Sequence, residues 1–132
     1  MFRILSMPKL IKIAIVEDDA MLLKYISAAF RTDGGFEVYT GSDGEMGEAV
    51  IKQQKPDIVL LDVIMPKKNG FEVLKELKKD PQTAKIPVIV LTNLGQQKDI
   101  DQAKKLGAAD YLVKVDLQVS EIVAKVKKFL IV

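Results

Sequence analysis

The chain has 132 residues, of which 48% are hydrophobic and 29% charged, and its formal net charge is +2. This length and composition predict one globular domain, and the near balance of charge gives no reason to expect nucleic acid or a membrane as a partner. The sequence contains no cysteine and no histidine, which excludes disulfides, thiolate or imidazole metal ligands and Ser-His-Asp catalysis. Any nucleophilic chemistry must therefore fall to carboxylates, lysines, hydroxyls or an oxygen-bound metal ion.

Residues 1–10 are mildly apolar but are interrupted by charged residues and a proline, which is a poor pattern for a signal-peptide core. We expect them to form an N-terminal extension outside a domain that spans 11–132. The domain is predicted to begin with an apolar strand over 11–16, followed by the acidic residues 17–19.

A helix is expected next, because Leu22, Leu23, Ile26, Ala29 and Phe30 recur at helical spacing. A pair of glycines then ends this helix. The alternating segment that follows is typical of a half-exposed edge strand.

This edge strand is predicted over 36–39, and a second helix is predicted from Asp43 with Met46, Ala49 and Val50 turned inward. After it the chain reaches a run of four apolar residues, Ile58 to Leu61, which leads directly into the carboxylate of Asp62. The run is interpreted as a central strand buried on both faces.

The central strand is predicted over 58–61 and ends on Asp62, with Pro66 and Asn69-Gly70 marking the loop beyond it. A third helix then begins at Gly70. Its inward residues are predicted to be Phe71, Leu74 and Leu77. A strand over 88–91 follows and ends at Thr92, and then a helix over 96–106 ends at Gly107. The last two elements are a strand over 111–113, which ends on Lys114, and a helix whose inward residues are Val119, Ile122, Val123, Val126 and Leu130.

Strand and helix thus alternate five times, which predicts an α/β fold: a flavodoxin-like, doubly wound, parallel sheet of five strands in the order 2-1-3-4-5 with five helices. In such sheets ligands bind beyond the carboxyl ends of the strands. That edge is expected to bring together Glu17, Asp18, Asp62, Thr92 and Lys114.

Carboxylates about 5 Å apart repel by roughly 3 kcal/mol per pair at an effective dielectric constant near 20. A fold that keeps such a cluster needs a shared proton or a divalent cation, and ligands that are all oxygen favour Mg²⁺ or Mn²⁺. Together with a lysine and a hydroxyl this outlines a phosphoryl-transfer site, with Asp62 as nucleophile, Lys114 neutralising charge and Thr92 donating a hydrogen bond.

Each of these residues also has a purely structural interpretation. Asp18 or Asp19 could cap the first helix, and for Asp19 we favour the cap. Thr92 could be a strand-end residue and Lys114 a surface lysine. The functional interpretation depends on several strand ends carrying complementary chemistry together.

As an ordered set, the motifs of this chain are highly specific. With Val-Glu-Asp-Asp at 16–19, Asp62 followed by Met65-Pro66 and Gly70, Leu91-Thr92, and Gly-Ala-Ala-Asp-Tyr-Leu-Val-Lys at 107–114, the chain resembles the receiver domain of bacterial two-component response regulators, of the CheY-like, single-domain type.

The resemblance implies that Asp62 accepts a phosphoryl group from the histidine of a kinase or phosphotransfer protein. It implies that Asp18, Asp62 and the backbone carbonyl of Ile64 hold Mg²⁺, with Glu17 close to the metal or binding it through water, and with Mn²⁺ as a substitute. Lys114 and Thr92 would assist at Asp62. Thr92 and Tyr111 would form the switch pair that changes binding to a downstream protein, although Tyr111 could also be an ordinary half-buried edge tyrosine.

In the same way, the resemblance implies a cytoplasmic phosphoprotein that is not an enzyme, but assists its own phosphorylation and dephosphorylation. We expect it to act alone, without an output domain, on the face formed by the fourth helix, the fifth strand and the last helix. The alternatives are a degenerate receiver that binds partners without phosphorylation, an aspartate-based phosphohydrolase, and a weaker one, a flavin or nucleotide binder.

The sequence departs from the family pattern at several positions. Val115 stands where proline is usual, Asn93 stands where a smaller residue is usual and is expected to narrow access to the site, and Lys68 replaces a frequent apolar residue. Ile64 and Leu94 flank the predicted approach of a hydrolytic water and cannot orient it, which suggests a long-lived phosphorylated state.

Overall fold

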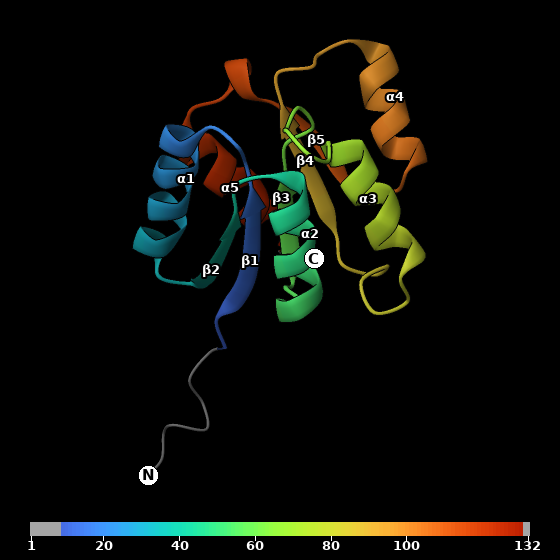
Figure 1. Ribbon diagram of the computed structural model, residues 1–132. Helices are drawn as coiled ribbons and strands as arrows, with labels where there is room; N and C mark the ends of the chain where they lie inside the picture. Colours follow the sequence, from blue (N-terminus) through green and yellow to red (C-terminus); the bar gives the residue numbers. More distant parts are fainter. Residues whose placement is uncertain (1–8, 131–132) are drawn as a thin grey trace.

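A computed structural model describes residues 9–130 of the chain (Figure 1). Residues 1–8, which make up most of the expected N-terminal extension, lie outside this range, as do residues 131–132 at the end of the expected domain. The elements in chain order are β1 (Ile11–Val16), α1 (Ala20–Asp33), β2 (Phe36–Gly41), α2 (Gly44–Gln54), β3 (Ile58–Leu61), α3 (Gly70–Lys79), β4 (Val88–Thr92), α4 (Gln97–Lys105), β5 (Asp110–Val113), a short 3-10 helix (Lys114–Asp116) and α5 (Val119–Leu130).

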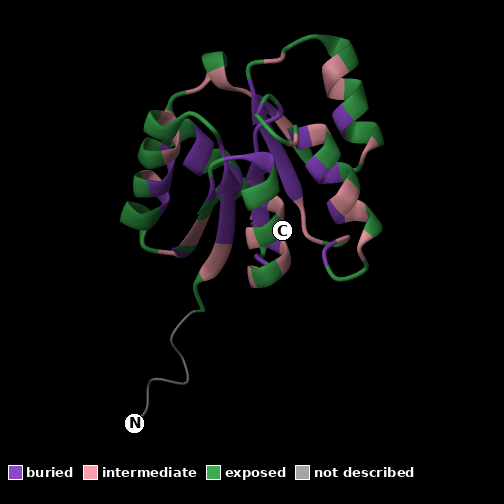
Figure 2. Cartoon of the chain, in the orientation of Figure 1, coloured by how far each residue is buried: buried purple, intermediate pink, exposed green. Residues whose placement is uncertain are grey.

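The five strands form one parallel sheet in the order β2-β1-β3-β4-β5, which confirms the predicted fold and strand order. Helices cover both faces, with α1 and α5 on one side and α2, α3 and α4 on the other (Figure 1). Between them β1, β3 and β4 are buried along most of their length, whereas the edge strands β2 and β5 are only partly buried (Figure 2).

Both faces of the central strands are apolar because each face packs against helices. In β1, Ile13 and Ile15 contact the cluster that includes Phe30 of α1, whereas Ala14 and Val16 contact the cluster under α2 and α3. This alternation explains why the central strands lack the apolar–polar pattern of a half-exposed strand.

Helix α1 begins where the sequence predicted. Its N-cap is Asp19, whose Oδ1 accepts a hydrogen bond from the backbone N–H of Leu22 at 3.1 Å, which confirms the capping role expected for that residue. Gly34 ends the helix with φ of 87°, a left-handed conformation that glycine adopts without strain.

The inward face predicted for α2 was wrong. Met46 and Ala49 are exposed and Val50 is only half-buried, whereas Gly44, Gly47 and Ile51 are buried. A Cβ atom on Gly47 would lie 2.4 Å from Cγ1 of Val16. The helix therefore packs its backbone closely against β1, and a search for large apolar side chains does not find such a face.

Two smaller differences concern the ends and faces of elements. Strand β2 continues to Gly41, because it pairs with β1 up to the pair Val16–Gly41. In α3, Leu74 and Leu77 are fully buried as predicted, whereas Phe71, also predicted to be inward, is only half-buried. Val73 is fully buried and was not among the predicted residues. None of the helices in residues 9–130 is long and apolar enough to cross a membrane.

Candidate functional site

The acidic site is formed where β1 and β3 end side by side. Val16 and Leu61 are the last paired residues of the two strands, and the backbone N–H of Asp62 donates to the carbonyl of Val16 at 3.0 Å. Glu17 and Asp62 therefore leave adjacent strands at the same level, as the parallel order predicted.

One carboxylate oxygen from each of Glu17, Asp18 and Asp62 lies within 4.8 Å of the other two. Glu17 is 2% exposed and Asp62 is 5% exposed, whereas Asp18 faces solvent. The cluster is thus a buried pair of carboxylates with a third at its mouth, and it opens to solvent on the side of Asp18.

Lys114 supplies the positive charge of this site. Its Nζ lies 2.5 Å from Oε1 of Glu17 and 3.0 Å from Oδ2 of Asp62, and its side chain is 15% exposed. Burial by itself would lower the pKa of Lys114, but the hydrogen bond to Glu17 and the charge of Asp62 outweigh it and raise the pKa above its ordinary value. The lysine is therefore a permanent cation here.

The backbone occupies the other oxygen atoms of the two buried carboxylates. Oε2 of Glu17 accepts from the N–H of Asp19 at 3.0 Å, and Oδ1 of Asp62 accepts from the N–H of Val63 at 2.7 Å. These bonds fix the carboxylate planes, so that Oδ2 of Asp62 faces Lys114.

Glu17 makes the folded chain sensitive to pH. Burial raises the pKa of Glu17 above its ordinary value of 4.5, against the lowering effect of Lys114. The folded chain thus holds this proton where the unfolded chain has lost it, and the resulting stabilisation, present below pH 4.5, is lost as the pH rises through the folded pKa.

Accordingly, the Glu17→Gln variant, measured by urea unfolding in EDTA, should lose less stability than the wild type between pH 4.5 and neutral pH. An identical pH slope in both proteins would contradict this account.

Thr92 and Tyr111 approach the same short segment after β4. Thr92 is fully buried, and its Oγ1 lies 3.5 Å from the backbone N of Leu94. The hydroxyl of half-buried Tyr111 donates to the carbonyl of Leu94 at 2.5 Å, and its side chain packs against the cluster of Val63, Val90 and Ala103. The predicted switch residues therefore share Leu94 as a neighbour.

Two features fix the loop after Asp62: close backbone packing at Gly70 and an ion pair made by Lys68. The N–H of Gly70 donates to the carbonyl of Val63 at 2.7 Å, and a Cβ on Gly70 would lie 2.1 Å from the carbonyl oxygen of Asp62. Lys68, whose presence the sequence did not explain, has its Nζ 2.5 Å from Oε1 of Glu48. This pair ties the loop to α2.

Ile64, in the same loop, was predicted to contribute its carbonyl to a metal site. Its side chain is 60% exposed, whereas that of the following residue, Met65, is 8% exposed and packs in the core under α2 and α3. The loop therefore turns one apolar residue toward solvent near Asp62 and anchors the next.

The sequence pattern of the response regulator receiver domain matches residues 13–127. The chain is 39% identical over 119 residues to the DNA-binding dual master transcriptional regulator RpaA of Synechocystis, covering 90% of this chain and 48% of RpaA. It is 39% identical over 100 residues to protein PilH of Pseudomonas aeruginosa, covering 76% of this chain and 83% of PilH.

Among solved structures, the Mn²⁺-bound form of the response regulator Rcp1 superposes with a TM-score of 0.72 and 31% identity, over 79% of this chain and 81% of Rcp1. The chain spans about half the length of RpaA and of several other transcriptional regulators that it matches. The match to the family pattern covers most of the chain, and this protein belongs to the receiver domains of two-component response regulators.

Proposed function

We propose that Asp62 is the residue of this receiver domain that accepts the phosphoryl group. The observation that carries the proposal is the placement of its carboxylate at the end of β3, with Oδ2 3.0 Å from Nζ of Lys114 and two further acids within 4.8 Å. A carboxylate oxygen of Asp62 attacks phosphorus, the bond from phosphorus to the donor histidine breaks, and the histidine nitrogen keeps the electron pair.

A divalent cation fits the acids of this site. Glu17, Asp18 and Asp62 offer only oxygen ligands, as Mg²⁺ and Mn²⁺ prefer, and the carbonyl of Ile64 is the proposed fourth ligand. Rcp1, a relative in structure, is known in a Mn²⁺-bound form. When bound, the cation would offset the negative charge of the acids and of the phosphoryl oxygens.

Lys114 and Thr92 complete the proposed site. The ammonium of Lys114 attracts a phosphoryl oxygen, and the hydroxyl of Thr92 turns toward the phosphoryl group once it is on Asp62. Because Thr92 and Tyr111 both lie against Leu94, a movement of Thr92 is transmitted to the tyrosine ring. The phosphoryl group ends on the chain itself, so the protein is an acceptor that assists its own reactions and not an enzyme with a separate substrate.

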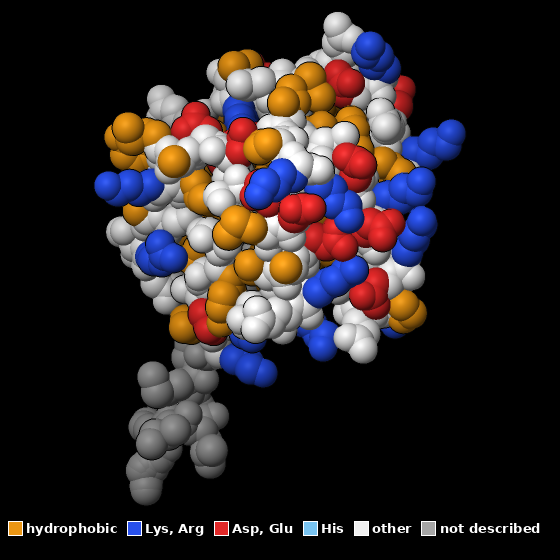
Figure 3. Space-filling model, in the orientation of Figure 1, with side chains coloured by type: hydrophobic (Ala, Val, Ile, Leu, Met, Phe, Trp, Pro, Cys, Tyr) orange, Lys and Arg blue, Asp and Glu red, His pale blue; other side chains and the backbone are white. Residues whose placement is uncertain are grey.

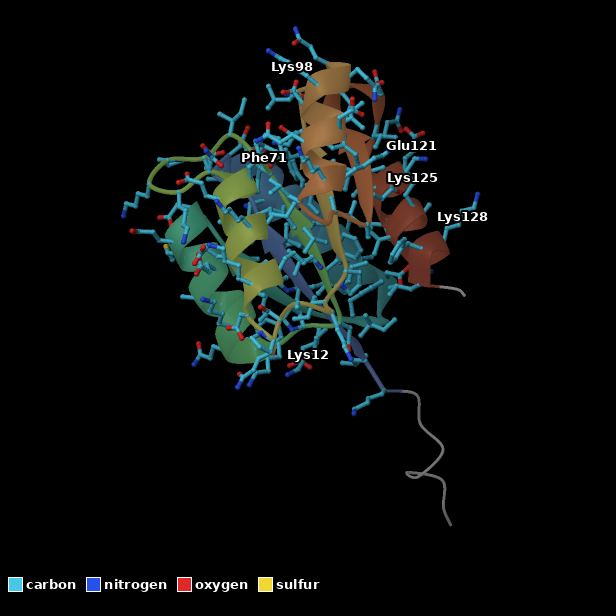
Figure 4. The ribbon with its side chains drawn as sticks, turned by 90° about the vertical axis from the view of Figure 1, so that its right-hand side faces the viewer. Lys12, Phe71, Lys98, Glu121, Lys125 and Lys128 are labelled. Atoms are coloured by element: carbon cyan, nitrogen blue, oxygen red, sulfur yellow. The ribbon has the colours of Figure 1, made fainter. Side chains whose placement is uncertain are left out.

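The proposed donor is the histidine of a kinase or phosphotransfer protein, and the proposed output is a downstream protein bound on α4, β5 and α5. Lys98 on α4 and Glu121, Lys125 and Lys128 on α5 point outward on this side (Figure 4). Figure 3 shows the molecule from the side of α2 and α3 instead, where acidic and basic side chains are interspersed. We place this exchange in the cytoplasm, where kinases find ATP, and assign it to residues 11–132.

Incubation with acetyl phosphate and Mg²⁺ tests the proposal. Intact-mass measurement should show one added phosphoryl group, peptide mapping should locate it on Asp62, and EDTA should prevent it. Mg²⁺ alone should raise the melting temperature, because the cation binds only the folded acid cluster. No added phosphoryl group, or one on another residue, would refute the assignment.

Ile64 is expected to prolong the life of the phosphorylated state, because its exposed apolar side chain cannot orient a hydrolytic water. The Ile64→Asn variant should lose the phosphoryl group faster than the wild type, by several-fold, since one hydrogen bond to the attacking water contributes about 1 kcal/mol. Phosphate release after removal of acetyl phosphate measures the rate. Equal rates in the two proteins would rule out this role for Ile64.

A further inference from the structure

The hydrogen-bonded pairing of β4 with β5 ends at the pair Thr92–Val113. One residue beyond the end of β4, the side chain of Asn93 makes a further bond, because its Oδ1 accepts a hydrogen bond from the backbone N–H of Val115 at 3.1 Å. A side chain thus continues the connection between the two strands beyond the end of the sheet. Lys114 is the residue between the last paired position and this added bond.

The backbone of Lys114 is consequently held on both sides. Val113 is fixed by the sheet and Val115 by Asn93, and the carbonyl of Lys114 accepts from the N–H of Leu117 at 3.1 Å. A lysine side chain has many rotamers and loses considerable entropy when its ammonium is confined. A rigid backbone limits where Nζ can go, and Nζ here contacts Glu17 at 2.5 Å and Asp62 at 3.0 Å.

We propose that Asn93 is a positioning residue for Lys114, acting through the backbone of Val115. This inference depends on the proposed phosphorylation of Asp62. The bond needs a backbone N–H at position 115, which a proline would lack. The two unusual residues that the sequence presented as separate departures, Asn93 and Val115, are therefore the two ends of one hydrogen bond.

Asn93 as a positioning residue and Asn93 as an obstruction predict opposite changes in the rate of phosphorylation when its side chain is made smaller. If Asn93 only narrows the entrance, a smaller side chain should speed phosphorylation, and a side chain of equal size should leave it unchanged. If Asn93 positions Lys114, every substitution that removes the acceptor oxygen should slow phosphorylation, whatever its size. The side chain is exposed, so such variants should fold.

The test compares Asn93→Ala with Asn93→Leu, which differ in size but both lack the acceptor. We expect both to lower the rate of phosphorylation by acetyl phosphate and Mg²⁺ about fivefold, the effect of one hydrogen bond. In a Lys114→Ala background, Asn93→Leu should have no further effect. A faster Asn93→Ala variant, or an equal loss in both backgrounds, would overturn the proposal.

Hydrogen exchange of the Val115 amide gives a second, independent measurement. Exchange should quicken in Asn93→Leu and stay slow in Asn93→Asp, which retains the acceptor oxygen; unchanged exchange in Asn93→Leu would overturn the proposal. Phosphorylation of the wild-type protein distinguishes a failure of the proposed function from a failure of the role proposed for Asn93. If it takes no phosphoryl group at all, the proposed function fails, whereas a phosphorylated wild type with unaffected Asn93 variants refutes only the role of Asn93.

Discussion

The Asp62→Asn variant is expected to take up no phosphoryl group from acetyl phosphate and Mg²⁺ under conditions in which the wild-type protein is phosphorylated. The side-chain amide has nearly the same shape but lacks the anionic oxygen that attacks phosphorus. Its carbonyl oxygen can still accept the bond from Val63, which is 2.7 Å long in the wild type, so the fold should persist. Intact-mass spectrometry measures the loss.

Asp43 offers a matched control, because it is a second buried aspartate, 7% exposed, in a different role. It caps α2 by accepting from the N–H of Met46 at 2.8 Å. Asparagine is an equally good N-cap, so Asp43→Asn should be phosphorylated like the wild type. Phosphorylation of Asp62→Asn at the wild-type level would show that another residue is the acceptor.

A Gly70→Ala substitution should lower both the stability and the reactivity of the protein. The new Cβ would lie 2.1 Å from the carbonyl oxygen of Asp62 and 2.7 Å from Cα of Val63, and backbone atoms cannot move aside as a flexible side chain does. We expect a loss of about 2 to 3 kcal/mol in the free energy of unfolding. Urea unfolding measures it, and slower phosphorylation should accompany it because the carboxylate is displaced.

Gly95, in the loop before α4, is the control for this substitution. The nearest atom to a Cβ there is Cγ1 of Val113 at 3.9 Å, an ordinary contact. Gly95→Ala should therefore keep the wild-type stability or gain slightly, because alanine restricts the unfolded chain. Equal stability of Gly70→Ala and wild type would mean that the loop tolerates a movement that the packing argument excludes.

The fold and the location of the site were predictable because they depend on patterns within short segments. Apolar runs such as 58–61 give strands, helical spacing gives amphipathic helices, and a parallel order brings the strand ends together. Glu17, Asp62 and Lys114 meet in the structure because each follows directly after a strand or its last paired residue. Sequence position alone therefore determined which side chains would meet.

The features that escaped prediction are contacts between segments that are far apart in the sequence. The inward face of α2 depends on close backbone packing at Gly47, not on the apolar side chains that a periodicity search scores. The partner of Lys68 is Glu48, which lies in α2, and nothing in the sequence around Lys68 indicates this pair. Likewise, Asn93 was interpreted by its size, because nothing in its neighbourhood indicates that its oxygen reaches Val115.

A crystal structure of the protein with Mg²⁺ and beryllofluoride, a mimic of the phosphoryl group, is the most direct test of the central claim. We predict beryllofluoride on a carboxylate oxygen of Asp62, a metal ion contacting Glu17, Asp18 and Asp62, and Nζ of Lys114 against a fluoride. An unmodified Asp62, with Glu17 and Asp18 turned away and no cation between them, would contradict the account.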